Sequence, residues 1–138
     1  MYVLIDTDVV LDLLLKRPPF FADAFALWQA ADQGRFERYV SAITPINVFY
    51  IARKSNGVAA AHQVVAELLA VVRVAPVDAA ILEAASASTL ADFEDAVQVA
   101  SALALGLDAI VTRNLDDYAG AALPAYPPAD LLRRLPAP

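Results

Sequence analysis

Short apolar runs alternate with longer helical segments along this chain, and this alternation limits the fold more than any other feature. We expect strands at 2–5, 39–43, 71–75 and 108–112, with a short edge strand at 124–126. We expect helices at 9–15, 20–31, 45–54, 58–69, 79–87, 93–106 and 129–135. A repeated strand-then-helix order is typical of a mainly parallel sheet with helices on both faces and right-handed crossovers. The sequence therefore predicts an α/β fold in three layers, α/β/α.

Polar residues at helix starts refine these boundaries. Thr44 and Pro45 together predict an N-cap followed by a proline in the first helical position. Asp78 and Asp92 each precede an apolar helical segment and are also expected to cap it. On the aromatic stripe of the second helix we expect Trp28 to be a core residue.

The composition bounds both the domain count and the chemistry. A chain of 138 residues fits one domain, 1–138, in which we expect 136–138 to be a frayed tail. No apolar stretch reaches the roughly 20 residues of a membrane span, so we expect a cytoplasmic protein without a membrane partner. The chain has no cysteine and a single histidine, His62, so a metal ion would be held by oxygen. Oxygen ligands favour Mg²⁺ or Mn²⁺.

The charge and hydropathy indicate what kind of surface to expect. Hydrophobic residues make up 59% of the chain, and part of this apolar surplus is expected at an interface. A net charge of −6 argues against broad electrostatic attachment to nucleic acid. It does not exclude a nuclease, because acids that bind divalent cations make a chain acidic while residues such as Arg53 and Lys54 contact phosphate.

Acidic residues stand in three clusters, each where an apolar run meets a turn or a helix start: Asp6 and Asp8, Asp92 and Asp95, and Asp116 and Asp117. Since the carboxyl ends of parallel strands share one edge of a sheet, these side chains are expected to converge there. Two metal ions held by shared carboxylates can activate a water and stabilise a leaving oxygen, as in many nucleases.

Each acid also has an ordinary structural interpretation. Asp92 and Asp95 favour the start of a helix, although capping needs only one of them. Asn and Asp are common turn residues, but the density of polar groups from Thr112 to Asp117 exceeds what a turn needs. Asp12, one helical turn after Asp8, is expected to face solvent.

Four stretches of the chain resemble PIN-domain proteins of the VapC-like toxin group: VLIDTDVVLDLL, SAITPINVFYIARK, DFEDAVQVASALALGLDAIVTRN and RNLDDY. The third stretch is the most specific. The resemblance implies a compact α/β/α fold and a metal-dependent endoribonuclease, the toxin of a type II toxin-antitoxin pair. It also implies a homodimer and an inhibitory antitoxin partner.

The resemblance also implies roles for individual residues. Asp6, Asp95 and Asp117 match the metal-binding acids, and Asn114 belongs to the closing motif. We expect supporting roles for Asp8, Asp92 and Thr112, and phosphate contacts from Arg53, Lys54 and Arg113.

Position 47 departs from the family pattern, because Asn47 stands where a glutamate is usual. An asparagine offers a carbonyl oxygen but no charge, so Asn47 would be a neutral ligand or would position a water. The substitution puts the strength of catalysis in doubt, not the fold, and Asp8 would return part of the missing charge.

Two alternatives remain open at this point. One is a weakened PIN domain that acts as an RNA- or protein-interaction module, with Asn47 marking the loss of activity. The other is a phosphatase like the haloacid dehalogenases, suggested by Asp6-Thr7-Asp8 after a strand. It would need a lysine ahead of the late acidic pair, and neither Lys16 nor Lys54 stands there.

Overall fold

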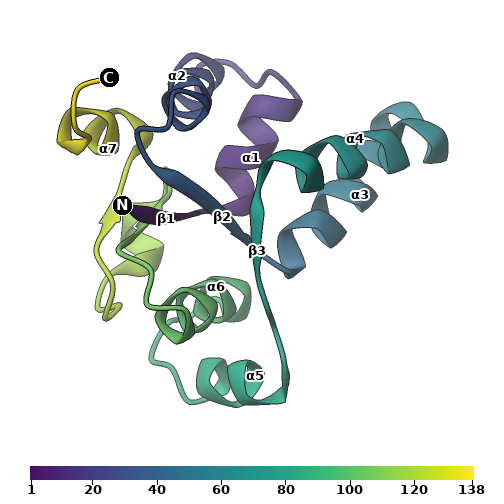
Figure 1. Cartoon of the computed structure of the whole chain (residues 1–138). Coiled ribbons are helices and arrows are strands. Elements are labelled where there is room, and N and C mark those ends of the chain that lie inside the picture. Colours follow the sequence, from purple (N-terminus) through teal and green to yellow (C-terminus); the bar gives the residue numbers. More distant parts are fainter.

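Five parallel strands form a single sheet at the centre of the molecule (Figure 1). The computed structural model describes residues 1–138. In spatial order the strands are β3 (Arg73–Ala75), β2 (Glu37–Ser41), β1 (Tyr2–Ile5), β4 (Ala109–Val111) and β5 (Ala125–Tyr126). All five lie within two residues of the runs predicted from the sequence, and the parallel sheet is confirmed.

The strand order places a topological switch between β1 and β4. From β1 the chain moves outward to β2 and β3, then crosses back to β4 and β5 on the other side of β1. Ile5 pairs with Val111, so Asp6 and Thr112 leave the sheet side by side. Ligands of open α/β sheets bind at the carboxyl ends of strands where the order reverses. The fold therefore marks the ends of β1 and β4 as the place to look for a site.

Helices cover both faces of the sheet, as the three-layer prediction requires (Figure 1). Val3 and Ile5 point into one core with residues of the first group of helices, whereas Leu4 points into the opposite core against Val99 of the second group. The first group comprises α1 (Thr7–Leu14), α2 (Phe21–Asp32), α3 (Ile43–Asn56), α4 (Val58–Val71) and α7 (Pro128–Arg134), and the second comprises α5 (Ala79–Ser86) and α6 (Phe93–Ala104). None of these helices has the length and apolar character needed to cross a bilayer.

Two predicted helix caps are confirmed and one is wrong. Asp78 accepts a hydrogen bond from the Ile81 N–H at 3.0 Å, and Asp92 does the same for Asp95 N–H at 3.0 Å. Thr44 is not an N-cap, because α3 already begins at Ile43. Its hydroxyl instead lies buried, 2.8 Å from the Thr7 hydroxyl, and ties the starts of α1 and α3 together.

The prediction that Trp28 is a core residue is only partly right. Trp28 is half-buried at the edge of the core, and the guanidinium of Arg38 covers its ring at 4.5 Å from the centroid. The face of α2 that enters the core carries Ala24, Leu27 and Ala30. These three residues belong to the buried core, whereas the indole packs against the core from its rim.

Substitutions on α2 should separate these two faces. Leu27 is fully buried, so Leu27→Ala should lower the free energy of unfolding by about 2–5 kcal/mol through lost burial and a cavity. Phe25 is 45% exposed, and Phe25→Ala should cost less than about 1 kcal/mol. Urea denaturation of the two variants measures both values. A larger loss for Phe25→Ala than for Leu27→Ala would contradict the assignment of the buried face.

Candidate functional site

Asp6 is the centre of the candidate site and lies directly after β1. Its backbone N–H extends the sheet by donating to the Val111 carbonyl at 2.9 Å. Its side chain is only 4% exposed and accepts three hydrogen bonds: from the Thr112 hydroxyl at 2.8 Å, the Gln98 amide at 3.1 Å and the Asp8 N–H at 3.4 Å. Donors from α6, from α1 and from the residue that follows β4 thus fix the orientation of one carboxylate.

Burial makes this carboxylate harder to ionise. Removal from water raises the pKa of Asp6, and the charge of Asp8 adds to the effect. The hydrogen bonds from Thr112 and Gln98 oppose it, because they favour the charged form, but burial is the larger influence. The hydrogen bonds alone therefore do not offset the cost of ionising Asp6, and a nearby cation would stabilise its negative charge.

Asp95 lies in the first turn of α6 and is tied to Asp6 through a relay of polar groups. The Tyr118 hydroxyl donates to Asp95 Oδ1 at 3.1 Å and accepts from the Gln98 amide at 3.0 Å, while the same amide nitrogen donates to Asp6. Burial, followed by the charges of Asp6 and Asp92, raises the pKa of Asp95 from its ordinary 3.8 to about 7. The hydroxyl of Tyr118 stays protonated, since burial and the charges of Asp6 and Asp95 raise its pKa.

The segment after β4 adds further oxygen atoms on one side of Asp6. Asn114 donates its side-chain amide to Asp8 Oδ2 at 3.2 Å, and its backbone N–H to the buried Thr112 hydroxyl at 3.0 Å. Asp117 is exposed, and its charge helps to raise the pKa of Asp95. Asp116 is exposed as well and makes no side-chain hydrogen bond or ion pair.

On the other side of Asp6, Asn47 meets a residue that the sequence interpretation passed over. The Asn47 amide donates to Glu94 Oε1 at 2.9 Å. Both side chains line a hollow of about 300 Å³ that also includes Thr7, Asp8 and Tyr50. Burial of the Glu94 carboxyl group, together with the charges of Asp92, Asp6 and Asp8, raises its pKa. Glu94 is therefore part of the acidic site.

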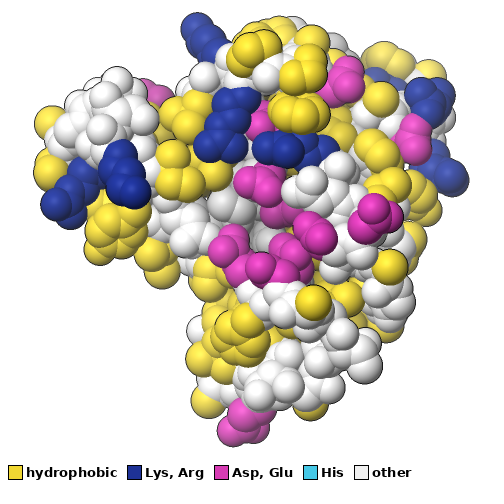
Figure 2. All heavy atoms as spheres, turned by 180° about the vertical axis from the view of Figure 1, so that it is seen from behind, with side chains coloured by type: hydrophobic (Ala, Val, Ile, Leu, Met, Phe, Trp, Pro, Cys, Tyr) yellow, Lys and Arg dark blue, Asp and Glu magenta, His cyan; other side chains and the backbone are white.

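No lysine or arginine neutralises these acids. The ion pairs of the molecule involve Asp12, Asp32, Glu37 and Asp130, and none involves Asp6, Asp8, Asp92, Glu94, Asp95 or Asp117. Figure 2 shows acidic side chains gathered near the middle of one face, with basic side chains along their upper border. Like charges concentrated without a counterion attract a cation.

The oxygen donors present fit a hard divalent cation, because such ions prefer carboxylate and amide oxygens. A bound cation would also relieve the repulsion between the carboxylates. In this conformation, however, no three acidic side chains come close enough together to hold one ion. Asp8 and Glu94 are hydrogen-bonded instead to the amides of Asn114 and Asn47. Cation binding would therefore require these acidic side chains to move closer together.

The prediction that Asp12 faces solvent is wrong, because Asp12 is only 1% exposed. Arg113 donates to it through Nε at 2.8 Å and through Nη2 at 3.4 Å, and Arg17 Nη1 lies 3.9 Å away. The Arg113 guanidinium also stacks over the Phe20 ring at 4.1 Å. Of the three predicted phosphate contacts, Arg113 is thus engaged inside the protein, whereas Arg53 and Lys54 are exposed in the last turn of α3.

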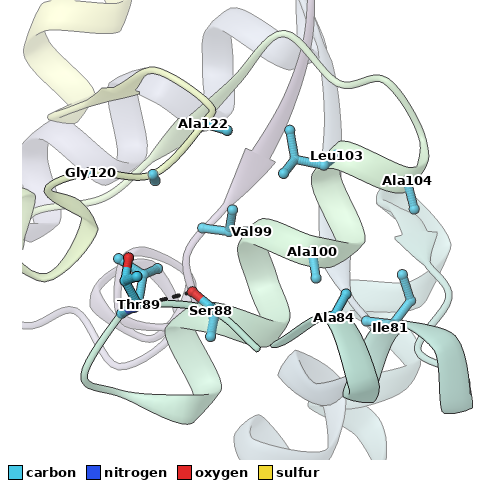
Figure 3. A pocket seen from close by; sticks show the side chains of 13 residues that line it. Ile81, Ala84, Ser88, Thr89, Val99, Ala100, Leu103, Ala104, Gly120 and Ala122 are labelled. Carbon is cyan, nitrogen blue, oxygen red and sulfur yellow. Dashed lines mark hydrogen bonds between the residues drawn. The ribbon is translucent and has the colours of Figure 1, made fainter. Parts of the chain in front are cut away.

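The largest groove of the molecule is separate from the acidic site. It has a volume of about 540 Å³ and lies between α5, α6 and the loop at 120–122 (Figure 3). Its walls are mostly apolar, from Ile81, Val99 and Leu103 among others. Of its two polar residues, Ser88 and Thr89, Ser88 accepts from the Leu90 N–H at 3.1 Å. Because this lining holds no titratable group, the groove is suited to apolar contacts and not to catalysis.

The chain belongs to the PIN-domain family, since the family model described as PIN domain matches residues 2–116. A toxin-antitoxin complex from Klebsiella pneumoniae has a similar fold, with 25% identity, a TM-score of 0.70 and coverage of 91% of this chain and 97% of that one. VapBC-1 from nontypeable Haemophilus influenzae matches at 18% identity and a TM-score of 0.72, covering 94% and 99%. VapC20 of Mycobacterium tuberculosis, described as a Sarcin-Ricin loop cleaving toxin, matches at 22% identity and a TM-score of 0.64. The match covers 78% of this chain and 86% of that one. No curated protein matches the chain in sequence.

Arg113→Ala should destabilise the fold, because it leaves the buried Asp12 carboxylate without its main partner. We expect a loss of about 3 kcal/mol in the free energy of unfolding, measured by urea denaturation. The double substitution Asp12→Leu with Arg113→Met removes both charges and should recover much of this loss. Arg53→Ala is the exposed control. Unchanged stability in Arg113→Ala, with weaker RNA binding, would instead favour a phosphate contact.

The raised pKa of Asp95 predicts a pH-dependent effect of Asp95→Asn on the metal-free protein. The folded state holds this proton up to about pH 7, whereas the unfolded state releases it near 3.8, so stability is lost as the pH rises through about 7. Asp95→Asn keeps an acceptor for Tyr118 and removes that loss. Its melting temperature in EDTA should exceed the wild-type value more at pH 8 than at pH 5. Asp23→Asn, on α2, is the control, and an equal difference at both pH values would contradict the prediction.

Proposed function

We propose that this PIN domain is a Mg²⁺- or Mn²⁺-dependent endoribonuclease that hydrolyses RNA phosphodiester bonds. The observation that carries the proposal is the group of acids at the switch point of a PIN fold, with no basic side chain to neutralise them. A buried, strictly oriented Asp6 and an Asp95 with a pKa near 7 are ill suited to a purely structural role. VapC20, which shares the fold, is described as cleaving the Sarcin-Ricin loop, and this supports RNA as the substrate.

The residues that would hold the metal are Asp6, Asp95 and Asp117, with the side-chain oxygens of Asn47 and Asn114 as neutral ligands or water positioners. Divalent ions bound there would supply a Lewis acid and lower the pKa of a water. Thr112, through its hydrogen bond, keeps Asp6 in place, and Asp92 supports Asp95 by capping α6. Asp8 adds charge beside Asp6 and holds Asn114. Arg53 and Lys54, which are exposed at the end of α3, would contact phosphates of the RNA, whereas Arg113 is held by Asp12.

We also propose a toxin role, with an antitoxin protein as inhibitor and a homodimer as the working form in the cytoplasm. Toxin-antitoxin complexes from Klebsiella pneumoniae and Haemophilus influenzae share the fold over nearly the whole chain. Ile46 and Tyr50, one turn apart on α3, are 57% and 56% exposed, and a protein partner would cover them.

A weakened PIN domain that acts as an interaction module is the second candidate. The observation in its favour is Asn47, which brings no charge to the site and whose amide is engaged with Glu94. The two candidates differ in one measurable property, the binding of a divalent cation. Absence of Mn²⁺ binding at millimolar metal, measured by calorimetry, would favour the interaction module.

The enzymatic proposal predicts metal-dependent cleavage that needs Asp95. Purified protein should cut single-stranded RNA with Mn²⁺ or Mg²⁺ and lose the activity in EDTA. Asp95→Asn, which keeps the Tyr118 hydrogen bond, should reduce the rate by at least about 100-fold, more than the 10–100-fold typical of residues that only support a ligand. Asp116→Asn, exposed and without a partner, should cleave like the wild type. Equal cleavage in EDTA, or by Asp95→Asn, would rule out the mechanism.

A further inference from the structure

The start of α6 carries three acids, the N-cap Asp92 and the first-turn residues Glu94 and Asp95, and two of the three have an identified partner. Asp92 caps the helix through the Asp95 N–H, and Asp95 accepts from Tyr118. Consecutive helical residues point about 100° apart, so Glu94 faces a different neighbour from Asp95. That neighbour is α3, where the neutral amide of Asn47 donates to it, and the hydroxyl of Thr7 is a further hydrogen-bond partner.

Glu94 and Asp95 have different neighbours: Glu94 accepts from Asn47 of α3, and Asp95 accepts from Tyr118. The charge of Asp6 acts on both, while Asp8 is among the charges that act on Glu94 and Asp117 among those that act on Asp95. The hollow at Glu94 is lined by Thr7, Asp8 and Asn47, the first of which directly follows Asp6 in the chain. The acidic site thus extends past Asp6 toward α3, with oxygen atoms of Asp8 and Glu94 at its rim.

We propose that Glu94 is a metal-binding residue of this site and that Asn47 acts through it, as a positioning residue that holds the Glu94 carboxylate beside Asp6 and Asp8. The inference rests on the proposed function, but in it Asn47 orients Glu94 and is no longer itself a neutral ligand or water positioner. The carboxylate on this side of the site comes from α6, and α3 supplies the amide that orients it. Asn47 is then no sign of a lost activity.

The hydrogen bond between Asn47 and Glu94 allows a reciprocal exchange as a test. Calorimetry with Mn²⁺ alone should show that Glu94→Gln lowers the affinity at least 10-fold, and that Asn47→Ala lowers it less. The double substitution Asn47→Glu with Glu94→Gln exchanges the carboxylate and the amide between the two positions. It should restore most of the Mn²⁺ affinity that Glu94→Gln loses. Glu83→Gln, an exposed acid on α5, is the matched control for the loss of one charge. Melting temperatures in EDTA confirm that each variant folds.

The outcomes separate this inference from the function on which it rests. If wild-type protein binds Mn²⁺ and Asp95→Asn loses binding, but Glu94→Gln binds like Glu83→Gln, only the role of Glu94 is overturned. Failure of the reciprocal exchange to restore affinity after a loss in Glu94→Gln would overturn the pairing with Asn47. If the wild type itself does not bind Mn²⁺, the proposed metal-dependent activity fails and the role of Glu94 fails with it.

Discussion

The burial of one carboxylate at the end of β1 is the constraint on which the rest of the site depends. A buried charge needs hydrogen bonds, and Asp6 obtains them from Thr112 and Gln98. Gln98 in turn accepts from the Thr7 N–H at 3.3 Å and donates to Tyr118. One fully buried amide thereby joins the start of α1, the first turns of α6 and the segment after β4. No buried polar side-chain atom lacks a partner, which makes this network costly to disturb.

Asp12, six residues later, shows how the same chain treats a buried acid that has no place in the site. Its charge is matched by Arg113 and Arg17, and it lies almost without solvent contact. Asp6 is as buried but receives only neutral donors. A protein that can pair one buried carboxylate with guanidinium groups has the means to pair both. Leaving Asp6 and its neighbours without a counterion is therefore a specific feature of the site, and it fits a role in binding a cation.

The fold could be predicted from the sequence because its determinants are local. Apolar runs of strand length, helical periodicity and the caps Asp78 and Asp92 lie within a few residues of the elements that they define. The acids were expected near one another because the carboxyl ends of parallel strands meet at one edge of the sheet. The side-chain partners could not be predicted, since they depend on long-range packing. Glu94 meets Asn47 across 47 positions and Tyr118 meets Asp95 across 23, and neither pair leaves a pattern in the sequence. After its first turn α6 is apolar apart from Gln98 and Ser101, and these two polar residues are the signal of a buried network that the sequence does offer.

The start of α6 explains how so many acids can be close together without unfolding the site. Asp92, Glu94 and Asp95 lie at the positive end of the helix dipole, which offsets part of their repulsion. The following turns, with Ala96, Val97 and Val99, are buried against the sheet and α5 and anchor the helix regardless of charge at its start. Stability thus comes from the apolar part of α6, and its first turn is free to carry surplus negative charge. Since the chain as a whole has a net charge of −6, the proposed RNA substrate would meet repulsion at the acidic site unless a bound cation reversed the local sign. In such a protein the metal would bring both the chemistry and the main attraction for the phosphate.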